Sequence, residues 1–75
     1  MSPLPQWRKD ILGGWQLWVY SGTCPSIAIG SVHLDKRARW RCRACSSAVG
    51  VRYTVEAARS RVERALNLPP CEVIE

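Results

Sequence analysis

Two cysteines, Cys42 and Cys45, form a Cys-x-x-Cys motif set among arginines. Two thiols at this spacing on a tight turn can bind one metal ion together, and the motif is common in tetrahedral zinc sites. The other ligands must come from Cys24, Cys71 or His33, because the chain has only 4 cysteines and 1 histidine. We expect Cys71 to complete the set, since the two prolines before it fix the direction of the chain. His33 is the alternative.

A chain of 75 residues forms one domain and buries a small core, so a metal or disulfides are expected to stabilise it. The first ten residues lack the apolar run of a signal peptide, which predicts a cytoplasmic protein with reduced thiols. Zinc is therefore favoured over disulfide bonds. With four protein ligands the site would be closed, and the zinc structural.

Two other readings of the cysteines remain open. Each cysteine, taken singly, can be a small buried hydrophobic residue. A redox role for the Cys-x-x-Cys motif would require a helix directly after it, and the sequence predicts none there. One histidine and 6 scattered acidic residues are also poor material for acid–base catalysis, so we expect a protein that is not an enzyme and has no small-molecule substrate.

The charge is concentrated in the second half of the chain. The segment from Lys36 to Arg64 has nine basic residues and only two acidic ones, Glu56 and Glu63, so its charge is +7, against +5 for the whole chain. This asymmetry predicts a basic surface that meets nucleic acid or an acidic protein surface, although an ordinary solvated basic surface is the alternative. Tryptophan and arginine are typical anchors of interfaces. The predicted partner-binding residues are Trp7, Arg8, Ile11, Arg39, Arg41 and Arg43, although Trp7 can equally fold back onto the sheet.

The sequence predicts an N-terminal arm over residues 1–14, with one or two helical turns, and a single zinc-stabilised domain over residues 15–75. Alternation of aromatic and β-branched residues with polar ones predicts strands at 15–20, 27–34 with a bulge or break at Gly30-Ser31, 38–42 and 49–53. A helix is expected over 55–66, capped by Thr54. Glycines and Pro25 interrupt the uncharged stretch 11–34, so we expect no membrane span.

The segments Thr23–Ser26 and Cys42–Cys45 together resemble a zinc ribbon, in which two cysteine-bearing turns enclose one ion. The chain departs from that pattern at Ile27, where a ribbon has its second cysteine. The resemblance implies an α+β fold: a small zinc-ribbon-like antiparallel sheet with a C-terminal helix. In size and composition the chain also resembles small bacteriophage transcription regulators. That resemblance implies a regulator that binds RNA polymerase and alters initiation or termination. The alternative is a module that binds DNA or RNA directly through its arginines.

Overall fold

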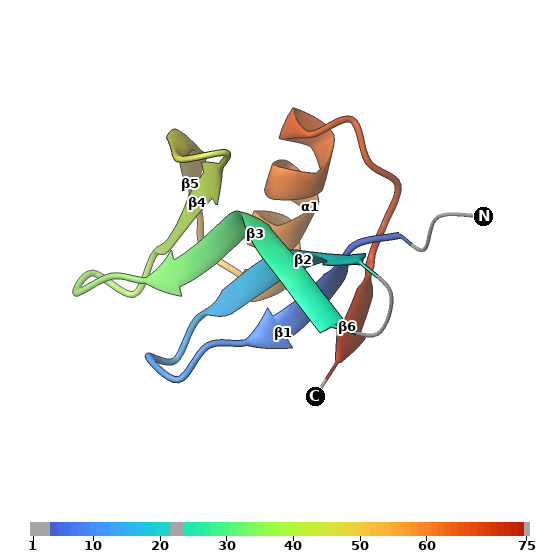
Figure 1. Cartoon of the computed structure of the whole chain (residues 1–75). Coiled ribbons are helices and arrows are strands. Elements are labelled where there is room, and N and C mark those ends of the chain that lie inside the picture. The colour runs from blue at the N-terminus through green and yellow to red at the C-terminus, as the bar shows by residue number, and fades with distance from the viewer. Residues whose placement is uncertain (1–3, 22–23, 75) are drawn as a thin grey trace.

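The computed structural model describes the backbone of residues 4–21 and 24–74, and the side chains of these residues except 20, 21 and 24–26. The elements follow the order β1 (Gln6–Lys9), β2 (Trp15–Ser21), β3 (Cys24–Leu34), β4 (Trp40–Ala44), β5 (Ser47–Arg52), α1 (Val55–Ala65) and β6 (Glu72–Ile74). The strands form one six-stranded sheet in the order β5-β4-β3-β2-β1-β6. Helix α1 packs against β3, β4 and β5 on one side of this sheet (Figure 1).

The fold is α+β, as expected, but two finer features differ from the prediction. The sheet is mixed, because β6 runs parallel to β1 while the other neighbours are antiparallel. The helix is not the last element, since β6 follows it and returns the chain to the edge of the sheet. The sequence did not predict β6, because a strand of three residues is too short to show the alternation of apolar and polar side chains by which strands are recognised.

The predicted N-terminal arm is wrong in its central part, because β1 lies inside the sheet between β2 and β6. Trp7 is 0% exposed and packs in the core with Leu17 and Val32. The spacing of Trp7 and Ile11 suggested a helical turn, but the pairing of β1 with β2 gives its backbone hydrogen-bond partners in a sheet. Burial of a whole indole outweighs the weak helical preference of so short a segment.

Helix α1 agrees closely with its prediction. The Thr54 side chain accepts a hydrogen bond from the Ala57 amide at 3.2 Å, and Asn67 ends the helix region in a left-handed conformation (φ 57°). Ala58 and Val62 face the sheet and are 0% exposed. Val62 packs directly over Gly30 of β3, where an added Cβ would lie 2.5 Å from Val62 Cγ1. The missing side chain at Gly30 thus lets the helix approach the sheet.

Strand β3 continues through Gly30-Ser31, so of the expected bulge or break the structure has a bulge, next to this position. The register with β2 passes from Leu17 opposite Gly30 to Trp18 opposite Ala28, and Ile29 is skipped. In the described part of the chain, the 11-residue α1 is well below the length required to cross a bilayer, and no helix there combines that length with sufficient hydropathy.

Candidate nucleic-acid interface

The arginines of β4 lie on the side of the sheet opposite α1. Cys42 and Ala44 are buried toward the helix, and the Cys42 thiol lies 3.6 Å from the backbone oxygen of Ala58. Because successive side chains of a strand point to opposite faces, Arg41 and Arg43 point away from the helix, and both are exposed. This confirms the expected alternation of β4 and defines an open sheet face.

Polar and basic residues form a row across this open face. Arg8 of β1 pairs with Gln16 of β2, Gln16 with Ser31 of β3, and Ser31 with Arg43 of β4. Directly paired residues share a face, so these four side chains lie side by side over a width of about 14 Å, which is three strand spacings. We call Arg8, Gln16, Ser31 and Arg43 the polar row.

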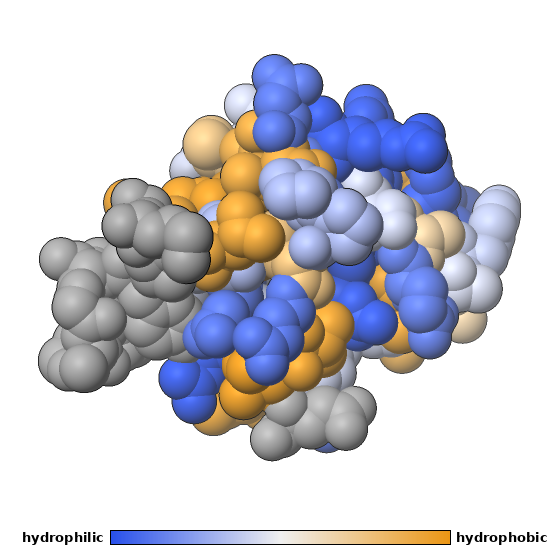
Figure 2. Space-filling model, turned by 90° about the vertical axis from the view of Figure 1, so that its right-hand side faces the viewer, coloured by the Kyte–Doolittle hydropathy of each residue, from blue (hydrophilic) through white to orange (hydrophobic). Residues whose placement is uncertain are grey.

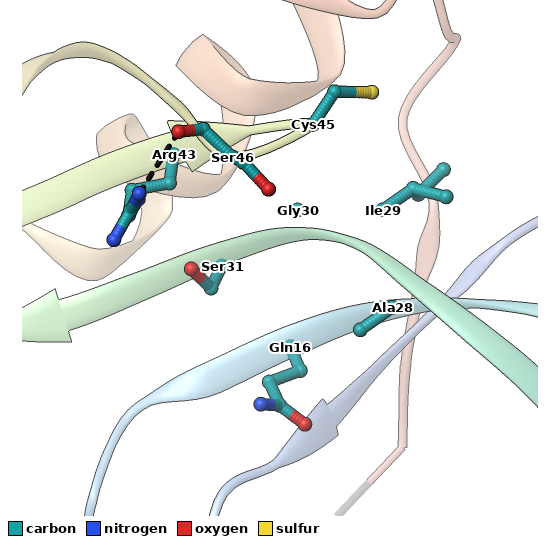
Figure 3. Close-up of a pocket in the computed structure, with 8 residues that line it drawn as sticks. All are labelled: Gln16, Ala28, Ile29, Gly30, Ser31, Arg43, Cys45 and Ser46. Carbon is teal, nitrogen blue, oxygen red and sulfur yellow. Dashed lines mark hydrogen bonds between the residues drawn. The ribbon is translucent and has the colours of Figure 1, made fainter.

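A hollow in the open face adjoins the middle of the polar row. Gln16, Ser31 and Arg43 line it from three successive strands, together with residues of the turn between β4 and β5 (Figure 3). Arg43 donates from Nη2 to the backbone oxygen of Ser46 at 2.8 Å, which orients its guanidinium. The hollow therefore presents amide, hydroxyl and guanidinium groups, the side-chain types that contact phosphates and base edges.

Two hairpin tips lie at one end of the sheet, since β1–β2 and β3–β4 both turn there (Figure 1). Asp10 organises the first tip. Its side chain accepts from the Leu12 amide at 3.0 Å and contacts His33 Nε2 at 3.0 Å. The His33 contact, more than any other, lowers the pKa of Asp10. The tip itself exposes two aliphatic side chains, Ile11 (99%) and Leu12 (83%).

The second tip, residues 35–39, is strongly basic. Arg39 and Arg41 both contact Asp35 through their Nε atoms, at 3.1 Å and 3.3 Å. Arg39 has 29% of its side chain exposed and Arg41 has 65% exposed. Of the three arginines of the predicted basic strand, Arg39 thus lies at the hairpin tip and Arg43 on the open face, while Arg41 belongs to the open face and also contacts Asp35 at the tip.

Other basic residues lie on the helix side of the sheet. A second hollow is lined by Arg52, Arg61 and Arg64, and Arg61 donates from Nε to the Val49 backbone oxygen at 2.8 Å. Arg59 lies over the ring of Trp15, with 5.4 Å between its Cζ and the ring centroid. The charge of the +7 segment is therefore spread over both sides of the sheet, because some of its basic side chains lie on the open face and others on the side of α1. Any one surface of the protein therefore carries less positive charge than the asymmetry in the sequence suggests.

The predicted zinc ligands lie in different settings. Cys42 is 1% exposed beneath α1, and burial raises the pKa of its thiol. Cys45 is exposed in the β4–β5 turn, where it and Ser46 adopt left-handed conformations (φ 51° and 72°). Burial, followed by the proximity of Glu63, raises the pKa of Cys71 to about 11.

A zinc ion shared by these cysteines would have to reach one thiol under the helix and another in an exposed turn. The side chain of Cys24 lies outside the described residues, and the described residues include no cluster of three or more histidine, cysteine or acidic side chains able to hold a metal. His33, the alternative ligand, contacts Asp10. Zinc binding by Cys24, Cys42, Cys45 and Cys71 stays a prediction.

Of the predicted partner-binding residues, Trp7 is removed from the surface. Its side chain is buried, and its Nε1 donates to Glu63 Oε2 at 2.9 Å. The prediction that Trp7 anchors a partner is wrong, because the sheet needs this indole for its core. Arg8, Ile11, Arg41 and Arg43 are exposed, and Arg39 is half-buried.

Sequence reasoning missed the contribution of Glu63, which is 7% exposed. Its carboxylate accepts from Trp7 Nε1 and, at 2.8 Å, from the Cys71 amide. Glu63 lies four residues after Arg59, a spacing typical of an exposed ion pair on a helix, whereas in the structure its side chain points inward. Only knowledge that Trp7 and Cys71 flank the helix would have revealed this role.

Hydrophobic residues also reach the surface on the side that carries β6, but hydrophilic ones separate them into patches (Figure 2). Such mixing is common on protein surfaces and does not identify an interface. Comparison of the chain with protein-family models, with curated proteins and with solved structures found no match.

Proposed function

We propose that the chain is a non-enzymatic module that binds DNA or RNA across its open sheet face. The observation that carries this proposal is the polar row, which places Arg8, Gln16, Ser31 and Arg43 on four adjacent strands. Arginine contacts phosphates and guanine edges, while glutamine and serine hydrogen-bond to base edges.

The electrostatics support the same choice. The chain carries a net charge of +5, and Arg41 lies two residues from Arg43 on the same face. Release of counterions from phosphates supplies most of the affinity of such a surface, so binding should weaken steeply with salt. Trp18 belongs to this face as well, because it pairs with Gln6 and Ala28, and its partly exposed indole is available for stacking on a base.

The test measures fluorescence anisotropy of labelled single-stranded and duplex oligonucleotides at several salt concentrations. Arg43→Gln should weaken binding and reduce the log–log salt slope by about 0.9 on duplex or about 0.7 on single strands, corresponding to one lost phosphate contact. Arg64→Gln is the matched control, because Arg64 is exposed on the helix side. Equal weakening by both variants, or no binding by the unmodified protein, would refute the proposal.

A second candidate function is a transcription regulator that docks on RNA polymerase. The tip of the first hairpin favours it, since Ile11 (99%) and Leu12 (83%) are highly exposed next to basic residues of β1. Burying two such side chains contributes about 3–6 kcal/mol, enough to matter in a protein interface. Retention of RNA polymerase by the immobilised protein after nuclease treatment, and its loss in Ile11→Ser, would support this candidate. Tyr53→Ser, at another exposed site, is the control.

Zinc remains a separate proposal about stability rather than function. It rests on the Cys-x-x-Cys spacing, and stoichiometric metal in protein purified without added chelator would support it. A protein that contains no metal and keeps its fold in strong chelator would exclude it.

A further inference from the structure

The hairpin tip between β3 and β4 combines a dense positive charge with one acidic side chain. Lys36, Arg37, Arg39 and Arg41 contribute four positive charges, and Asp35 contributes one negative charge, which leaves +3. These five residues line a shallow hollow at the end of the sheet. Only 13% of the Asp35 side chain is exposed, so the acid lies beneath the cations that surround it.

The Asp35 carboxylate is the hub of this tip. One oxygen, Oδ1, accepts from the backbone amides of Arg37 at 2.8 Å and Arg39 at 2.9 Å. The other oxygen, Oδ2, accepts from Nε of Arg39 at 3.1 Å and Nε of Arg41 at 3.3 Å. The first pair of bonds shapes the turn, while the second pair fixes two guanidinium groups beside each other.

Asp35 stays ionised across the physiological range. Hydrogen bonding from the Arg39 amide, with further help from Arg37 and Arg41, lowers the pKa of Asp35 to about 2 against the opposing effect of burial. Each guanidinium that donates Nε to this carboxylate keeps its other nitrogens for a second acceptor. A planar guanidinium with a fixed orientation suits phosphate oxygens particularly well.

We propose that the hollow at residues 35–41 binds a phosphate group of a nucleic-acid backbone, and that Asp35 is a positioning residue that holds Arg39 and Arg41 ready for it. This inference deepens the proposed function and rests on it. The position of the hollow supports a nucleic acid over an acidic protein. Arg41 lies two residues from Arg43 along β4 on the same face, about 7 Å away, so a nucleic-acid strand that contacts Arg43 and continues along β4 reaches the hairpin tip.

The decisive variant is Asp35→Asn, which raises the net charge from +5 to +6. If charge alone governs affinity, the variant should bind nucleic acid more tightly. If Asp35 positions the arginines, it should bind about five- to tenfold more weakly, because two mobile side chains must then be ordered on binding. The two explanations predict effects of opposite sign.

Asparagine is suited to this test because its oxygen can still accept from the two backbone amides that shape the turn. Its NH₂ group replaces the oxygen that held the two Nε atoms. Asp10→Asn is the matched control, since it makes the same charge change at the other hairpin tip, away from Arg39 and Arg41. We expect this control to bind as tightly as the unmodified protein or more tightly.

A second variant covers the case in which Asp35→Asn fails to fold, judged by circular dichroism. Replacing Arg39 and Arg41 by lysine keeps the charge and the Asp35 backbone bonds but removes the oriented guanidinium groups. It should show a similar loss of affinity.

The outcomes separate the two proposals. Absence of nucleic-acid binding by the unmodified protein overturns the proposed function and this inference together. Binding by the unmodified protein with equal or tighter binding by Asp35→Asn overturns the inference alone. Polyglutamate is the competitor that tests the ligand class: displacement of the oligonucleotide at equal charge concentration would show that the hollow accepts carboxylates and overturn the assignment to phosphate.

Discussion

Glu63 joins three parts of the chain through one buried carboxylate. It belongs to α1, and its Oε2 accepts from Trp7 Nε1 in β1 at 2.9 Å and from the Cys71 amide before β6 at 2.8 Å. In this way it holds the N-terminal and C-terminal strands against the helix. We predict that Glu63→Ala destabilises the protein severely.

The expected size of the effect follows from the two donors that lose their acceptor. A buried donor without a partner costs about 1–3 kcal/mol, and this full range applies to Trp7, which is 0% exposed. The Cys71 amide is only partly buried, so water can replace some of its bond and its share is about 1 kcal/mol. The total of about 2–4 kcal/mol is a large part of the roughly 4–11 kcal/mol expected for a domain of this length.

Urea denaturation followed by tryptophan fluorescence measures this loss. Glu56→Ala is the control, because Glu56 is exposed in the first turn of the same helix and its removal should cost no more than about 1 kcal/mol. Glu63→Gln should be milder than Glu63→Ala, since it keeps an oxygen for both donors. If Glu63→Ala is no less stable than Glu56→Ala, the buried carboxylate does not have the role assigned to it.

Three further predictions concern other parts of the fold. The pKa of Asp35 falls from 3.8 to about 2 on folding, so the stability that its carboxylate contributes is complete above pH 3.8 and is lost as the pH falls toward 2. Asp35→Asn should therefore lose less stability than the unmodified protein over this pH range, as measured by acid unfolding. Identical acid-unfolding profiles of the two proteins would contradict this prediction. Gly30→Ala should lower the free energy of unfolding by about 1–3 kcal/mol in thermal unfolding, because the added Cβ meets Val62. In the background of Val62→Ala the same substitution should cost less. If the effects of the two substitutions simply add in the double variant, the clash is ruled out. An alkylating reagent near neutral pH should modify Cys45 well before Cys42, because Cys45 is exposed and Cys42 is buried; peptide mass spectrometry measures both. If Cys45 is instead protected, and a chelator removes the protection, bound zinc is indicated.

Local chemistry was sufficient to predict most elements in the middle of the chain. The strand of aromatic and β-branched residues at β2, the alternating strand β4 and the helix α1 with its Thr54 cap each follow from propensity and periodicity. The alternation over residues 38–42 placed Arg39 and Arg41 on the face away from the core, and the structure has Arg41 exposed there. These features depend on neighbours a few residues apart, which a sequence displays directly.

The two ends of the chain could not be predicted in the same way. Strand β1 pairs with β2 on one side and with β6 on the other. In the pairing with β6, Gln6 lies opposite Glu72, which is 66 residues away along the chain. Short strands carry little pattern of their own and form only where the sheet accepts them. For this reason the sequence left Trp7 open between an exposed arm and a position against the sheet, and the structure places it in the core.

Propensity and periodicity along the chain predicted a small basic α+β fold with a capped helix and with Arg39 and Arg41 on the outer face of a strand. The tertiary structure shows which basic residues share a surface, because cross-strand register brings Arg8, Gln16, Ser31 and Arg43 into one row. It also decided that Glu63 is buried and that Cys42 and Cys45 lie in different surroundings. Strand pairing brings the polar row together, and packing of the helix against the sheet buries Glu63 and Cys42; spacing along the chain encodes neither relation.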